Sequence, residues 1–235
     1  MHTDYKDFEY FDFHDSYFQK VEIFDNRLIW YLEAVNVSNL CAGNPYSCSM
    51  MAAEMKVEFI DYEIKEQSFS LKKLAEDSYE ILEVRKIKVS DGKYTYLFIL
   101  CSFRDCIEIE ISFSNILFEW EKYESKAWYV YVAELELTKK FLSENPQIEW
   151  LVLDSKQGSS FVKELHSELT EAHPLYCIEA MAYAKSENSD DILFSLDNGK
   201  CAIIHLTYSR QNMNGFPKFT EFESIEKALE SIKND

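Results

Sequence analysis

Residues 79–113 read YEILEVRKIKVSDGKYTYLFILCSFRDCIEIEISF, and this stretch decides the fold class. Asp91-Gly92 supplies the two positive-φ positions of a tight hairpin turn, so we expect an antiparallel strand on each side of it. The second of these strands, residues 93–101, is apolar on both faces, which is typical of a central strand. Residues 107–113 alternate apolar side chains with Glu or Ser, which predicts a strand with one buried face.

The same strand-like patterns extend to both sides of this stretch. Val21–Phe24 and Leu28–Val37 predict a hairpin. Trp128–Leu137 predicts a further strand in the same style. We therefore expect residues 1–157 to form a β-rich domain, an antiparallel meander of about seven strands arranged as a barrel or a sandwich.

A different pattern begins near Gly158. Ser160 is a candidate N-cap of a helix that ends before Pro174. Three strands are expected next, over residues 175–184, 191–196 and 201–208. A last helix begins after Ser224. We expect residues 158–235 to form a small α-β-β-β-α domain, a three-stranded antiparallel sheet with helices on one side, and the whole chain to be α+β and strand-dominated.

The charge of the chain limits its partners. Its 42 acidic and 24 basic residues give a net charge of −18. Such a field does not suit a phosphate backbone or an anionic membrane, so we expect a basic protein partner, no nucleic acid and no membrane. The chain opens without a signal-peptide pattern, and its six cysteines contain no C-x-x-C pair. We expect reduced, mostly buried thiols and a cytoplasmic location.

Two acidic segments are candidate partner-binding surfaces. Residues 7–15, DFEYFDFHD, interleave acids with aromatics, which suits a basic protein surface. The acids of this segment are Asp7, Glu9, Asp12 and Asp15. In the alternative interpretation the aromatics face the core, and the acids prevent edge-to-edge pairing. Glu108 and Glu110 share one face of their strand and form either a carboxylate pair or a solvated stripe.

The residues form no recognisable catalytic or cofactor motif. The five glycines are scattered singly, without a phosphate-binding loop. No two of the five histidines have a metal-binding spacing on one element. We therefore expect a non-catalytic protein with no cofactor and no metal.

The alternative hypothesis is an enzyme, or a protein that binds a small molecule or an ion, with its site between the two domains. Its candidate residues are His173, Asp191 and His205. Each of them also has a structural interpretation. His173 would favour the dipole at a helix C-terminus, Asp191 would be a solvated turn residue, and His205 would be a hydrogen-bonded strand histidine.

Three short motifs in the second domain point to a family. They are His173-Pro174-Leu175, Asp190-Asp191-Ile192-Leu193-Phe194 and His205-Leu206-Thr207-Tyr208-Ser209, followed by Pro217 and Phe222. Residues 173–222 in this way resemble a bacterial domain family of the toxin–immunity type, with the pattern H-P-L, D-D-[VI]-L-F and H-L-T-[WY]-S. The resemblance implies an immunity or antagonist protein that neutralises a basic toxin, and it brings no enzymatic activity with it. A non-catalytic acidic protein-binding module is our leading hypothesis.

Overall fold

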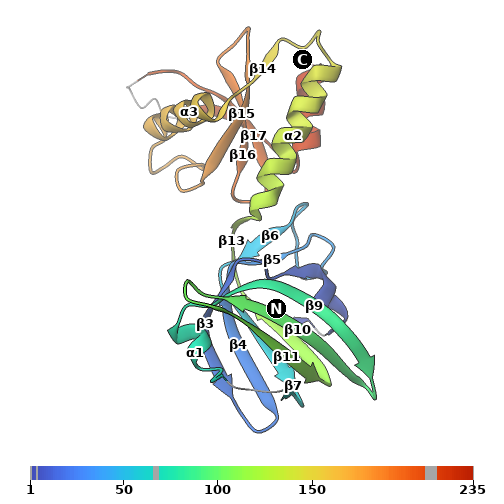
Figure 1. Ribbon diagram of the computed structural model, residues 1–235. Helices are drawn as coiled ribbons and strands as arrows, with labels where there is room; N and C mark the ends of the chain where they lie inside the picture. Colours follow the sequence, from blue (N-terminus) through green and yellow to red (C-terminus); the bar gives the residue numbers. More distant parts are fainter. Residues whose placement is uncertain (1, 4, 66–68, 210–215, 235) are drawn as a thin grey trace. The chain divides into compact units, whose positions relative to one another are not determined.

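The computed structural model describes residues 2–3, 5–65, 69–209 and 216–234 (Figure 1). Strands make up 44% of it and helices 22%, so the molecule is strand-dominated, with antiparallel sheets. The chain divides into two compact units. Unit 1 comprises Met1–Pro45 and Ser49–Glu124, and unit 2 comprises Tyr46–Cys48 and Ser125–Asp235. The division therefore falls at residue 124 and not near Gly158, which lies inside a helix of unit 2.

Unit 1 contains two antiparallel sheets. The larger has nine strands in the order β1-β12-β7-β4-β3-β9-β10-β11-β8. They are β1 (His2–Thr3), β3 (Ser16–Ile23), β4 (Arg27–Glu33), β7 (Met55–Ile60), β8 (Glu63–Lys65), β9 (Glu80–Ser90), β10 (Lys93–Cys101), β11 (Cys106–Phe113) and β12 (Asn115–Trp120). Because β12 lies between β1 and β7, the strands do not follow the simple sequential order of a meander.

The smaller sheet has the order β13-β6-β5-β2. Its strands are β2 (Phe11–Asp12), β5 (Val35–Val37), β6 (Met50–Ala52) and β13 (Tyr123–Lys126), the last of which continues into unit 2. A 3₁₀ helix, η1 (Tyr5–Tyr10), and a single helical turn, α1 (Lys73–Glu76), complete unit 1.

The predicted hairpins of unit 1 are confirmed. Asp91 and Gly92 join β9 to β10 with φ angles of 52° and 74°, as the turn chemistry requires. The hairpin of β3 and β4 is also present, but its second strand ends at Glu33, and the predicted residues 35–37 form β5 in the smaller sheet. β10 lies between β9 and β11, but the second face of this strand is only half-buried, at Leu97 and Ile99.

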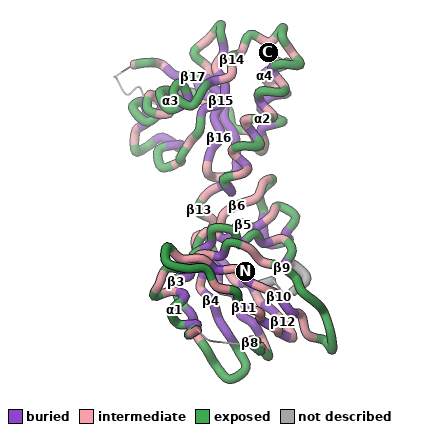
Figure 2. The backbone as a smooth tube through the Cα atoms, viewed as in Figure 1, coloured by how far each residue is buried: buried purple, intermediate pink, exposed green. Residues whose placement is uncertain are grey.

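Aromatic rings fill the core of unit 1, which Figure 2 shows as buried chain. Trp30, Phe59 and Phe98 meet edge to face, with centroids 4.8 to 5.9 Å apart. Such contacts add about 0.5–1.5 kcal/mol per pair beyond the burial of area. The high aromatic content of the sequence therefore serves packing in this unit.

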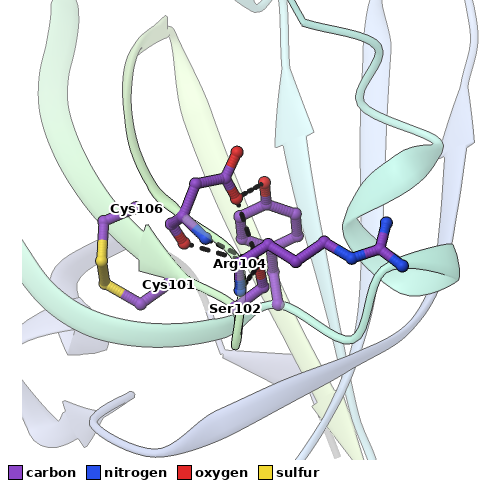
Figure 3. The surroundings of a disulfide bond; sticks show 6 residues. Cys101, Ser102, Arg104 and Cys106 are labelled. Atoms are coloured by element: carbon purple, nitrogen blue, oxygen red, sulfur yellow. Dashed lines mark hydrogen bonds between the residues drawn. A yellow bond between two sulfur atoms is a disulfide. The ribbon is translucent and has the colours of Figure 1, made fainter.

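Two of the six cysteines form a disulfide, which corrects the expectation of reduced, mostly buried thiols. Cys101 and Cys106 face each other at the end of β10 and β11 and close the loop between them (Figure 3). A four-residue hairpin loop places its flanking residues directly opposite each other, a geometry that a search for C-x-x-C pairs does not detect. Among the other thiols, Cys41 and Cys201 are buried, but Cys177 is exposed.

Hydrogen bonds inside this loop fix its shape (Figure 3). The amide of Ser102 donates to the Asp105 carbonyl at 2.8 Å, and the Ser102 hydroxyl donates to the Asp105 carboxylate at 3.1 Å. The hydroxyl of Tyr79 donates to the same carboxylate. Phe103 at the loop tip is 85% exposed.

Unit 2 is a five-stranded antiparallel sheet with helices on both faces. The strand order is β14-β15-β16-β17-β18. The strands are β14 (Trp150–Val152), β15 (Ala180–Ser186), β16 (Asp191–Leu196), β17 (Cys201–His205) and β18 (Lys218–Phe222). Helix α3 (Ser155–Glu168) packs on one face, and α2 (Trp128–Glu144) and α4 (Ile225–Asn234) pack on the other. The prediction of helices on one side was therefore wrong, because α3 and α4 cover opposite faces, and the prediction of three strands between two helices was incomplete, because β14, β18 and α2 were missed.

Helix α2 replaces the strand predicted over Trp128–Leu137. Its buried residues recur every fourth position, which is the helical period, but two of them are polar. They are Val130, Glu134, Thr138 and Leu142. A hydrophobic pattern cannot reveal a helix whose buried face carries a carboxylate and a hydroxyl.

No helix within the described residues is both long and apolar enough to cross a bilayer.

The start of α3 also differs from the prediction. Asp154, not Ser160, is its N-cap, and the Asp154 carboxylate accepts a hydrogen bond from the amide of Gln157 at 2.8 Å. The Gln157 side chain accepts in return from the amide of Asp154, which completes a capping box. α3 ends at Glu168. The prediction of the last helix is confirmed, because α4 begins at Ile225, directly after Ser224.

Candidate functional site

The acidic opening segment lies against the core of unit 1 and is not one extended strand. Residues 5–10 form η1, and only Phe11 and Asp12 form a strand, β2. Phe8, Phe11 and Phe13 are buried, and their ring centroids lie 5.6, 4.2 and 6.3 Å from that of Phe118. The aromatics therefore face the core, as the alternative interpretation of this segment expected.

A pocket of about 410 Å³ lies beside this segment. We call it the acidic-rimmed pocket. Its apolar lining includes Phe8, Phe11, Phe13, Leu82, Val84 and Tyr96. Its ionisable lining consists of Glu9, Asp12, His14, Glu83 and Lys86. An apolar floor below carboxylates suits a lysine or arginine side chain, whose stem is apolar and whose end is a cation.

The carboxylates of the acidic-rimmed pocket have different partners. Glu9 lies 3.5 Å from the amino group of Lys86. Asp12 accepts a hydrogen bond from the amide of His14 at 3.0 Å. The carboxylate of Glu83 accepts hydrogen bonds from the Nε and Nη2 atoms of Arg85, each at 2.5 Å, and this hydrogen bonding lowers the pKa of Glu83.

Of the other predicted partner-binding acids, Asp15, Glu108 and Glu110 do not line this pocket. The side chain of Asp7 lies outside the described part of the structure. Asp15, at φ 64°, is exposed and pairs with the Nδ1 atom of His14 at 3.0 Å. On β11, Glu108 is exposed, whereas Glu110 is half-buried and lies 3.4 Å from the amino group of Lys65. The structure thus brings Glu9 and Asp12 together.

A larger pocket, of about 760 Å³, lies in unit 2. We call it the histidine pocket. His173, Asp191 and His205, the three residues of the alternative hypothesis, all line it. All three belong to unit 2, whereas the alternative hypothesis placed them between two domains.

His205 and Asp191 form a hydrogen-bonded pair. They lie directly opposite each other on β17 and β16, and the Nδ1 atom of His205 lies 2.9 Å from the Asp191 carboxylate. The second oxygen of this carboxylate accepts from the hydroxyl of Ser189 at 2.6 Å. The pair is partly exposed, since 47% of the His205 side chain and 32% of the Asp191 side chain are accessible. Because an ionised carboxylate only accepts hydrogen bonds, Nδ1 carries the proton and Nε2 remains available.

His173 has a structural role in the same pocket. Its Nδ1 atom accepts from the amide of Leu175 at 3.2 Å, so its Nε2 atom carries the proton and donates to the Pro217 carbonyl at 3.0 Å. Its ring packs on Phe219, with centroids 5.3 Å apart. His173 is not at a helix C-terminus, because α3 ends at Glu168. With both nitrogens bonded to the protein, His173 is a poor candidate for a ligand-binding residue.

Glu168 is a residue that the sequence did not point to. Its buried carboxylate accepts hydrogen bonds from the amides of Thr207 and Tyr208, at 2.7 to 2.9 Å, and from the hydroxyl of Thr207 at 2.8 Å. These bonds hold the chain where it leaves β17, at Tyr208 with φ 50°. The Thr207-Tyr208 part of the third motif therefore has a structural explanation.

A buried polar network is the second feature that sequence reasoning missed. The amino group of Lys126 lies 2.7 Å from the Glu134 carboxylate and donates to the hydroxyl of Ser195 at 2.9 Å. Glu134 also accepts from Ser195 at 2.6 Å and from the hydroxyl of Tyr183 at 3.1 Å. The Lys126 side chain is 0% exposed. The network joins α2 to the sheet, and no spacing in the sequence indicates it.

Burial changes the acidity of two members of this network. It raises the pKa of the Cys201 thiol, which lies 3.7 Å from Glu134, to about 12, and the negative charge of Glu134 adds to this effect. Burial is also the main cause of the raised pKa of Tyr183, followed by the charge of Glu134. Both groups therefore stay protonated at neutral pH and act as donors.

Comparisons with known proteins assign no family to this chain. No family model, curated protein or solved structure matches it. Within the described residues, no group of three or more histidine, cysteine or acidic side chains is placed to hold a metal ion.

Proposed function

We propose that this chain is a non-catalytic acidic protein-binding module, an immunity or antagonist protein that neutralises a basic partner. The observation that carries the proposal is the acidic-rimmed pocket of unit 1, in which Glu9 and Asp12 lie beside a floor of buried aromatic rings. A lysine or arginine of the partner would place its stem on the rings and its charge between the carboxylates.

Three further features support this proposal. The net charge of −18 speeds the encounter with a positively charged protein. The buried rings of Phe8, Phe11 and Phe13 hold the acidic segment in place before binding, which lowers the entropic cost of association. The resemblance of residues 173–222 to a family of the toxin–immunity type fits the same function.

The test is direct binding of the proteins encoded beside this gene, measured by calorimetry with the full chain. We expect one of them, with a positive net charge, to bind, and its affinity to fall as salt rises from about 0.05 to about 0.5 M. The double variant Glu9→Gln/Asp12→Asn should weaken this binding about tenfold, or about 1.4 kcal/mol. Binding by none of the encoded proteins would contradict the proposal.

A matched control distinguishes the contribution of the pocket to affinity from the contribution of net charge. Glu226→Gln/Glu230→Gln removes two exposed carboxylates of α4, in unit 2, and changes the net charge by the same amount. This control should retain full affinity. If both double variants weaken binding equally, net charge alone explains the interaction and the acidic-rimmed pocket is not the site.

A further inference from the structure

We propose that the histidine pocket of unit 2 binds a small organic anion, a carboxylate or a phosphate monoester carried on an apolar body. This inference is independent of the function proposed above, because it concerns a different unit and a ligand of opposite charge.

A row of three polar side chains provides the anion-binding end of the site. Asp191, His205 and Lys218 lie directly opposite one another on β16, β17 and β18. Residues paired in this way project from the same face of a sheet and are close neighbours. His205 and Lys218 can therefore donate to one bound anion, the first through Nε2 when protonated and the second through its ammonium group.

Asp191 orients His205 for this role. Its carboxylate oxygen accepts a hydrogen bond from the Nδ1 atom of His205 at 2.9 Å. Nε2 is therefore the ring nitrogen available to a ligand. Asp191 is thus a positioning residue, and both of its oxygens are already engaged, by His205 and Ser189.

The same face of the sheet provides the apolar end of the site. Ile203 is two residues from His205 on β17, and Phe222 and Thr220 follow Lys218 on β18 at the same spacing of two residues. Side chains two residues apart on a strand share a face. All of them line the histidine pocket, as does Ser231 of α4, whose hydroxyl is a further donor. An apolar surface with convergent donors is typical of a small-molecule site.

His173 borders the pocket from the other side of the edge strand. Its ring packs on Phe219, which lies opposite Ile204 and therefore faces away from His205. The pocket thus curves around the start of β18. Binding of the anion depends on the face that carries His205, and His173 holds the strand that forms this face through Pro217.

The acidity of the protein does not prevent anion binding here. Each carboxylate of the Asp190-Asp191 pair has a cationic or protonatable partner, since Asp190 lies 3.6 Å from the amino group of Lys185 and Asp191 is bonded to His205. No carboxylate of the described chain lies within ion-pair distance of Lys218, which instead lies 5.3 Å over the ring of Phe216. Charges farther away than about 8 Å are largely screened at physiological salt.

The experiment is an NMR titration of the full-length, ¹⁵N-labelled protein with phenyl phosphate and with benzoate. Benzyl alcohol is the neutral control. We expect at least one anion to bind with a Kd of about 1 mM and to shift the Nε2 signal of His205, as suits a ligand of this size. Binding of phenyl phosphate or of benzoate identifies the class of anion. Benzyl alcohol should bind at least about tenfold more weakly.

Variants with matched controls locate the site. Lys218→Met and His205→Gln should each weaken binding of the anion at least about tenfold. Lys140→Met and His166→Gln, at exposed positions of α2 and α3 outside the pocket, should leave it unchanged. Lys218 is exposed on an edge strand, so its variant tests the site even if His205→Gln does not fold.

Three results would overturn the proposal. The first is that neither anion binds at about 10 mM, ten times the expected Kd. The second is equal binding of benzyl alcohol, which would show that the charge is not recognised. The third is binding that survives both Lys218→Met and His205→Gln, because the anion would then lie elsewhere on the protein.

Discussion

The interior of unit 1 and the interior of unit 2 are stabilised by different kinds of interaction. The core of unit 1 consists mainly of apolar side chains, with Phe118 at the centre of a cluster of rings, and its buried carboxylate, Glu58, pairs with the partly exposed Arg27 and Lys56. Unit 2 has apolar cores on both faces of its sheet, but it also buries the ion pair of Lys126 and Glu134 with its hydroxyl partners. Apolar contacts tolerate substitutions of similar volume, whereas a buried charge depends on its specific partner. The two interiors should therefore respond differently to mutation.

The largest effect is expected for Lys126→Met. This change leaves the carboxylate of Glu134 buried without its cation, and we expect a loss of about 3–5 kcal/mol in the free energy of unfolding of unit 2. The measurement is amide hydrogen exchange of β16 and β17 in urea.

The control for this prediction is the double variant Lys126→Met/Glu134→Gln. It removes both charges and keeps an oxygen that can accept from Ser195 and Tyr183, so it should recover most of the loss. A single variant as stable as the natural protein would show that the ion pair is not a structural requirement of unit 2.

The next effect concerns the disulfide of unit 1. Cys101→Ser/Cys106→Ser should lower the stability of unit 1 by about 2 kcal/mol, because the bond closes a short loop in the unfolded chain. Denaturant unfolding with and without reductant measures this difference. Reductant should destabilise the natural protein but not the double variant, and Cys177→Ser, at an exposed thiol of unit 2, should have no effect.

A third prediction concerns alkaline pH and unit 2. The pKa of Cys201 is raised from 9.0 to about 12 in the folded protein. Above pH 9 the unfolded chain loses this proton while the folded protein keeps it, so the stability of the folded state falls as pH rises toward 12. The slope is about 1.4 kcal/mol per pH unit for each such group, and Tyr183 adds to it in the same direction.

The variant Cys201→Ala isolates the contribution of the thiol to this slope. Unfolding measured at a series of pH values from about 8 to 11 should show a shallower decline for this variant. Cys177→Ala, at an exposed thiol, should reproduce the slope of the natural protein. An unchanged slope in Cys201→Ala would mean that its thiol ionises alike in the folded and unfolded states.

The smallest effect is expected for Phe118→Leu in unit 1. Leucine keeps the site apolar but gives up the contacts of Phe118 with three rings, so we expect a loss of about 1.5 kcal/mol, measured by urea unfolding monitored through the exchange of the amides of β12. A loss as large as that of Lys126→Met would show that the rings of unit 1 depend on one another as closely as the buried charges of unit 2 do.

Local patterns predicted much of the strand structure. The Asp91-Gly92 turn, the one-sided alternation of residues 107–113 and the last helix depend on neighbouring residues, and all three are present. The prediction failed for α2, where Glu134 and Thr138 occupy buried positions. Those two residues are buried because of partners elsewhere in the fold, and a pattern of apolar residues does not contain that information.

The candidate sites divide in the same way. The sequence singled out Glu9, Asp12, Asp191 and His205 as polar residues in distinctive segments. It did not indicate that Asp191 and His205 bond to each other, that Lys218 completes their row, or that His173 is occupied by backbone groups. These facts depend on the register of β16, β17 and β18.

The sequence by itself determined the strand-dominated character of the protein, its hairpin turns and its acidity, because turn chemistry, side-chain alternation and charge depend on each residue and its close neighbours. Only the tertiary structure decided which polar groups meet. Lys126 meets Glu134 and Ser195, and His205 meets Asp191, because the strands and helices that carry them pack in one particular arrangement. Contacts between distant residues are set by the packing of the whole unit, so no local pattern in the chain can specify them.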